Sequence, residues 1–90
     1  MPTSFDFESA LSRLFRRAEE DGRPYIDINS GELHRRVGGY PSRNHRMPLC
    51  CDVMKKNMQT GDQILEKPPK GKGASLTIRY KLPRRERMSK

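Results

Sequence analysis

The stretch QILEKPPKGKGASLTIRYKL, residues 63–82, decides the fold that we predict for this chain. Residues 75–82 alternate strictly between apolar and polar side chains, which is the pattern of a half-buried β-strand. Residues 63–67 form a second short strand, and the intervening 68–73 are rich in proline, glycine and lysine, as turns are. We therefore predict an antiparallel hairpin with one solvent-facing side, which Pro83 ends. The apolar face of its second strand consists of Leu76, Ile78, Tyr80 and Leu82.

The most regular helical pattern lies near the start of the chain, over residues 5–20. Its apolar side chains recur at helical spacing along one stripe. Thr3 or Ser4 stands where an N-cap is needed, and Asp21-Gly22 provides the stop. Residues 25–28 then alternate as a strand, which is so short that it needs a partner from a sheet formed elsewhere.

Two more helices are predicted between this strand and the hairpin. The first covers residues 31–37, with Asn29 or Ser30 as its cap, and Gly38-Gly39 ends it because glycine adopts positive φ readily. The second covers residues 45–58. One of its faces carries a stripe of sulfur-containing side chains that we assign to the core: Met47, Cys50, Cys51, Met54 and Met58.

The chain is strongly basic, and the excess charge is not confined to one end. Nineteen Lys and Arg against eleven Asp and Glu give a net charge of +8. Residues 84–90, four cations against Glu86, contribute +3 and are predicted to be a disordered basic tail. Residues 1–83, predicted to be a single domain, still carry +5. Such an imbalance favours a polyanionic partner, because each neutralised phosphate releases a counterion.

Composition also argues against several classes of protein. Apolar residues make up only 32% of the chain, which leaves few side chains to line a cofactor crevice or a small-molecule site. No run of about 18 apolar residues is present, so we expect no membrane span. The first residues lack the pattern of a secretory signal. Because Cys50 and Cys51 are adjacent and are the only cysteines, we expect a reducing, cytoplasmic environment.

We expect no metal, cofactor or catalysis. Adjacent cysteines are poorly spaced to chelate zinc, even with His34 and His45 available. A Cys50–His45 nucleophile pair is disfavoured because the two side chains would lie about 140° apart around a helix. His34 is expected to cap or pack near the end of its helix instead.

The predicted order is helix, short strand, helix, turn, helix, strand, basic turn and strand. This order resembles that of the winged-helix family, a helix-turn-helix followed by a C-terminal β-hairpin called the wing. The resemblance covers residues 5–82 and depends on element order, without a signature motif. It implies an α+β fold with a three-helix helix-turn-helix core and a small antiparallel sheet. In that family the third helix commonly lies in the major groove of DNA, and the hairpin tip touches phosphates or the minor groove.

On this chain those roles fall on the third helix and on the hairpin. Arginine forks onto guanine and asparagine pairs with adenine, and backbone N–H groups at a helix start favour a phosphate. Lysines separated by glycine can approach a phosphate backbone without obstruction. The predicted DNA-binding residues are Ser42, Arg43, Asn44, His45, Arg46, Lys56, Lys70, Lys72, Arg79 and Lys81.

We therefore predict a small non-enzymatic protein that binds double-stranded DNA, as a transcriptional or DNA-processing accessory factor. The alternative is a winged-helix module that docks onto a protein partner within a nucleic-acid-processing assembly, with Pro48 and Leu49 as candidate contacts. RNA binding is less well supported, because the 3 Tyr and 3 Phe are mostly needed in the core and cannot form a stacking platform.

Overall fold

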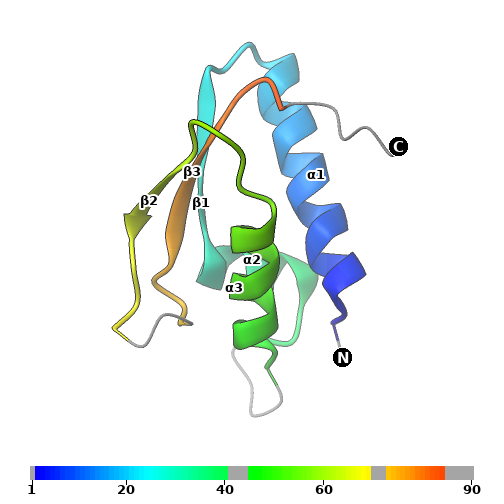
Figure 1. The fold of residues 1–90 in the computed structure, drawn as a ribbon. Helices are drawn as coiled ribbons and strands as arrows, with labels where there is room; N and C mark the ends of the chain where they lie inside the picture. Colours follow the sequence, from blue (N-terminus) through cyan, green and yellow to red (C-terminus); the bar gives the residue numbers. More distant parts are fainter. Residues whose placement is uncertain (1, 41–44, 70–72, 85–90) are drawn as a thin grey trace, which may run out of the picture.

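The computed structural model describes residues 2–40, 45–69 and 73–84. They form, in chain order, α1 (Ser4–Glu20), β1 (Tyr25–Asn29), α2 (Ser30–Val37), α3 (Met47–Lys56), β2 (Gln63–Glu66) and β3 (Thr77–Lys81). The sheet lies on one side of the molecule and the helices on the other (Figure 1). The prediction of a small α+β fold with three helices and an antiparallel sheet is confirmed. No helix in the described ranges is long and apolar enough to cross a membrane.

The three strands form one antiparallel sheet in the order β1-β3-β2. The predicted hairpin is confirmed, since β2 pairs with β3 and Ile64 lies opposite Ile78. β1 pairs with the other edge of β3, which places Ile28 across from the same Ile78. The last strand of the chain is therefore the central one, and it supplies the partner that the short first strand needs. An irregularity between Ile64 and Glu66 interrupts β2, where Leu65 is 45% exposed.

The core fills the space between this sheet and the helices. The apolar face predicted for the hairpin is buried, and so are the sulfur-containing side chains of α3. Met58, which lies beyond the end of that helix, is partly buried against the core. Tyr80 shows how β3 joins the helices, because its ring lies 4.9 Å from that of Phe15. Its hydroxyl donates a 2.8 Å hydrogen bond to the carbonyl of Met54. Burial raises the pKa of this hydroxyl above its ordinary value.

Side chains and glycines set the ends of the first two helices. Thr3 caps α1 in a reciprocal capping box with Asp6, and Asn29 caps α2 by accepting from the N–H of Glu32 at 3.1 Å. Gly38 and Gly39 follow α2 with φ of 112° and 80°, as predicted for the turn that ends it.

Helix α3 is shorter than predicted at both ends. It begins at Met47, with Arg46 as the N-cap and a proline in the first turn, and it ends at Lys56. At its C-terminal end the Asn57 side chain donates to the carbonyl of Val53 at 2.8 Å, so a side chain satisfies a carbonyl there.

Arg84, predicted to begin the disordered tail, is instead held against the domain. Its guanidinium forms an ion pair of 2.9 Å with Asp62 and donates to the carbonyl of Asn57 at 2.7 Å. The guanidinium also lies 4.7 Å from the ring centre of Phe15 and 5.0 Å from that of Tyr80. The ordered chain therefore extends at least to residue 84, because this side chain finds partners in α1, β3 and the α3–β2 connection.

Candidate nucleic-acid interface

Half of the predicted DNA-binding residues lie within the described ranges. His45 and Arg46 stand at the start of α3, Lys56 is its last residue, and Arg79 and Lys81 belong to β3. The other half, Ser42, Arg43, Asn44, Lys70 and Lys72, lie outside the described residues.

Two histidine side chains accept hydrogen bonds from backbone N–H groups at the start of α3. The Nε2 atom of buried His34 accepts a 2.9 Å hydrogen bond from the backbone N–H of Arg46. The Nδ1 atom of His45 accepts from the N–H of Met47 at 3.2 Å. The expectation that His34 caps or packs is confirmed, although the helix that it caps is α3 and its own helix is α2.

These bonds change the expected role of the helix start. An anion bound there needs free backbone donors, but the N–H of Met47 is already taken and Pro48 has none. The backbone of this helix end is thus largely satisfied from within the protein. The side chains presented at this helix end are the exposed His45 and the partly buried Arg46.

Aromatic rings continue this surface onto α2. The Tyr40 ring lies 5.4 Å from that of His34 and 5.6 Å from that of His45. The guanidinium carbon of Arg35 lies 5.8 Å from the centre of the Tyr40 ring. Sequence reasoning missed this connection because it treated α2 only as a supporting helix. The available signal was the pair of exposed arginines in the last turn of α2.

The end of the hairpin loop is fixed beside α2 and α3. The carbonyl of Gly73 accepts from the Ser30 hydroxyl at 2.7 Å and from the Cys51 thiol at 3.4 Å. Next to it, the N–H of Gly31 donates to the carbonyl of Ala74 at 3.2 Å. A side chain at Gly31 would sit 3.1 Å from that carbonyl oxygen, so glycine permits this close approach. The start of α3 and the start of β3 therefore lie at the same end of the molecule (Figure 1).

The Arg79 side chain is paired with residues of the neighbouring strand. It donates to both carboxylate oxygens of Asp27 on β1, at 2.8 and 3.1 Å. Its guanidinium carbon also lies 4.0 Å from the centre of the Tyr25 ring. The hydrogen bonds to Asp27 raise the pKa of Arg79 above its ordinary value. The charge that the sequence assigned to a phosphate surface is therefore paired with a carboxylate on the neighbouring strand.

Lys56 and Lys81 do not join His45 and Arg46. Lys56 ends the ten-residue helix that Arg46 caps, so their backbones are separated by about 15 Å of helix length. Lys81 ends β3 at the opposite end from the hairpin loop, where its N–H donates to Asp62. The structure brings together the start of α3 and the base of the hairpin loop, and it leaves these two lysines apart from them.

The net charge is distributed unevenly along the chain. The described residues hold thirteen Lys and Arg against ten Asp and Glu, a net +3. The total is +8, so the other residues of the chain carry the remaining +5. Apart from the uncharged Met1, these are residues 41–44, 70–72 and 85–90.

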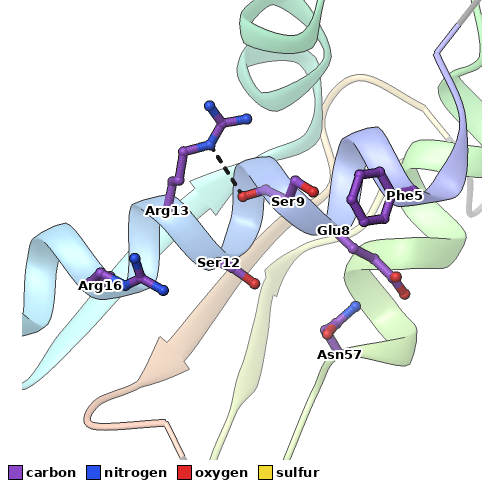
Figure 2. Close-up of a pocket in the computed structure, with 7 residues that line it drawn as sticks. All are labelled: Phe5, Glu8, Ser9, Ser12, Arg13, Arg16 and Asn57. Atoms are coloured by element: carbon purple, nitrogen blue, oxygen red, sulfur yellow. Dashed lines mark hydrogen bonds between the residues drawn. The ribbon is translucent and has the colours of Figure 1, made fainter.

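A shallow groove of about 430 Å³ runs between α1 and the residue that follows α3 (Figure 2). Phe5, 73% exposed, stands at one end, and Arg16 lies at the other. The described residues lining this groove include no histidine or cysteine that would activate Ser9 or Ser12 as a nucleophile. The lining residues are Phe5, Glu8, Ser9, Ser12, Arg13, Arg16 and Asn57.

Cys50 and Cys51 are buried thiols, and neither is part of a disulfide. Burial, with a smaller effect of Cys51, raises the pKa of the Cys50 thiol to about 12, so this sulfur is protonated at neutral pH. Within residues 2–40, 45–69 and 73–84, no cluster of three or more His, Cys, Asp or Glu side chains is arranged to hold a metal ion.

Comparison with known proteins reveals no relative: no family model, no curated protein and no solved structure matches this chain.

Proposed function

We propose that this chain is a winged-helix DNA-binding domain that grips duplex DNA with the end where α3 begins and the hairpin turns. The element order and the sheet order β1-β3-β2, with a C-terminal hairpin, support a winged-helix interpretation. The domain would act by positioning arginine, lysine and histidine side chains against the duplex, without chemistry of its own.

The single observation that carries this function is the attachment of Gly73 to α2 and α3. Its carbonyl is 2.7 Å from the Ser30 hydroxyl and 3.4 Å from the Cys51 thiol. Lys72 directly precedes Gly73 in the sequence, and Arg43 is two residues before His45. His45 and Gly73, the described residues next to these two basic stretches, lie at one end of the small domain, and this supports phosphate contacts from both stretches on two sides of a groove.

A salt titration tests this function. We expect the affinity for a short random-sequence duplex, measured by fluorescence anisotropy, to fall steeply between about 50 and 200 mM salt. Replacing Arg43, Lys70 and Lys72 with alanine should weaken binding and lower the salt slope by about 1 per cation removed. An affinity of the unaltered protein that does not change with salt would contradict phosphate contact.

The matched control removes three exposed cations elsewhere: Arg23, Lys56 and Lys81. This control variant loses as much positive charge as the variant at Arg43, Lys70 and Lys72. If the phosphate contacts are local, the control should nevertheless keep the wild-type salt slope. Equal losses in both variants would mean that binding follows net charge, and no defined interface would then exist.

Docking onto a protein partner is the alternative function. Pro48 is exposed on α3, but Leu49 is partly buried against the core and offers a protein groove less apolar surface than the sequence predicted. Under this alternative the triple variant at Arg43, Lys70 and Lys72 keeps its partner, and the unaltered protein has no measurable affinity for the duplex.

A further inference from the structure

A second cluster of cations lies on the face formed by α1 and α2. Arg13 and Arg17 on α1 and Arg36 in the last turn of α2 line one groove of about 220 Å³. All three are exposed. None of them has a carboxylate within ion-pair distance among the described residues, whereas Arg79 and Arg84 each have one. Figure 2 shows Arg13 extending away from Asn57 and toward α2, with only its Nε bonded to the Ser9 carbonyl at 3.5 Å.

Three guanidinium groups around one groove are unfavourable in the absence of an anion. Like charges four residues apart on a helix repel each other, as Arg13 and Arg17 do. Arg36 adds a third positive charge from the neighbouring helix. Such a broken local rule is expected at a functional site, and a bound phosphate would relieve the repulsion.

The groove suits phosphate better than an acidic peptide. Besides the three arginines, only Ala10 and Leu14 are among its described lining residues, too little apolar surface for the aromatic or large apolar anchor of a peptide. The exposed Phe5 lines the neighbouring groove of Figure 2 and is not among the residues lining this one. Arginine forks match the oxygen geometry of phosphate, and three of them can hold one group or two adjacent groups.

Helix α2 links this groove to the start of α3, because it carries Arg36 on the groove and, one residue before it, Arg35. Arg35, next to Arg36 in α2, lies over Tyr40, whose ring lies 5.6 Å from that of His45. We propose that Arg13, Arg17 and Arg36 form a second phosphate-binding site, which takes the backbone of the same nucleic acid beyond the start of α3. This inference rests on the proposed function and extends its footprint onto α1.

The first experiment uses inorganic tripolyphosphate and does not depend on duplex binding. In an NMR titration of the whole protein, the side-chain Nε–Hε signals of Arg13, Arg17 and Arg36 should shift together and saturate. The signal of Arg23, an exposed arginine outside the groove, should not. R36Q should abolish the saturable shifts of the arginine side chains, while the backbone amide spectrum remains that of a folded protein. The site is overturned if the Arg23 signal shifts as much as the others, or if the signals of Arg13, Arg17 and Arg36 do not shift.

The second experiment uses the DNA duplex. The triple variant R13Q/R17Q/R36Q should bind more weakly, with a salt slope smaller by about 1 per arginine, while R23Q should match wild type. If the triple variant binds duplex like wild type, the groove does not hold nucleic acid, although the proposed function survives. If wild type itself does not bind duplex, the proposed function fails and the nucleic-acid assignment of the groove fails with it. Saturation by a poly-glutamate peptide at lower concentration than by the duplex would assign the groove to an acidic protein and overturn the proposal.

Discussion

At the scale of single residues, the Asp62 carboxylate accepts hydrogen bonds from several donors that are far apart in the sequence. It accepts from the N–H groups of Gln59 and Lys81, at 2.7 and 2.8 Å, and from the Arg84 guanidinium at 2.9 Å. The Asp62 side chain is fully buried and that of Arg84 is 11% exposed. A buried charge of this kind depends on its partner, because an unpaired carboxylate in the interior is strongly destabilising.

Replacing Arg84 with alanine should lower the free energy of unfolding by about 3–5 kcal/mol, because Asp62 is then left buried without its counter-charge. Urea denaturation measures this loss. Deleting residues 85–90 while keeping Arg84 is the control, and it should leave the stability unchanged. A shortened chain that is as unstable as Arg84→Ala would assign the effect to the segment and not to the ion pair.

The Cys50 thiol makes stability fall at alkaline pH. Its pKa is raised from 9.0 to about 12 in the folded protein, so between these values the unfolded chain releases a proton that the folded chain retains. The contribution is fully present below pH 9 and is lost as pH rises toward 12, at most about 1.4 kcal/mol per pH unit. The raised pKa of Tyr80 acts in the same direction.

Urea denaturation at a series of pH values between about 8 and 9 measures this slope, below the ordinary pKa of tyrosine, which is about 10. In Cys50→Ala the fall of unfolding free energy per pH unit should be smaller than in wild type, even if the variant is less stable at every pH. An unchanged slope in this variant would show that another group is responsible.

At the scale of elements, helix α3 depends on α2 for its beginning. Its N-cap, Arg46, makes no side-chain capping bond, and the imidazole of His34 accepts the N–H of that residue. The His34 ring also packs edge-on against Phe7 at 5.0 Å, so it combines packing with capping.

His34→Phe separates the two roles, because it retains an aromatic ring and removes the acceptor. It should lower the free energy of unfolding by about 1–3 kcal/mol, the cost of an unsatisfied buried donor. Hydrogen exchange should quicken for the N–H of Arg46 relative to the second half of α3. His34→Ala should cost more, since packing is lost too. Full stability of the phenylalanine variant would contradict a capping role.

The elements themselves were predictable because their signals are local. Period-two alternation marked β3, helical spacing marked α1, and Asn29 marked the start of α2. The start of α3 was misplaced by two residues, since a histidine twelve positions earlier fixes it. The sequence also contains no local sign that Asp27 faces Arg79, because 52 residues separate them and only the pairing of β1 with β3 brings them together.

At the scale of the whole molecule, the end of the hairpin loop is attached to two helices. Gly73 fixes the hairpin loop beside α3 through two side chains that the sequence suggested only as a helix cap and a core residue, Ser30 and Cys51. The two basic stretches were predictable from the sequence. The attachment of Gly73 beside α2 and α3 was not, because it depends on side chain–backbone bonds between residues that are distant in the sequence. The clustering of Arg13, Arg17 and Arg36 was likewise hidden until α1 and α2 packed together.

The most direct test of the central claim is an NMR titration of the whole protein with a random-sequence DNA duplex, following every backbone amide. We predict that the largest shifts occur around His45, Arg46 and Gly73, with smaller shifts near Arg36. The amides near Lys81 and Arg23 should stay unchanged. The largest shifts on the outer face of the sheet around Arg79, or no shifts at any residue, would contradict the account.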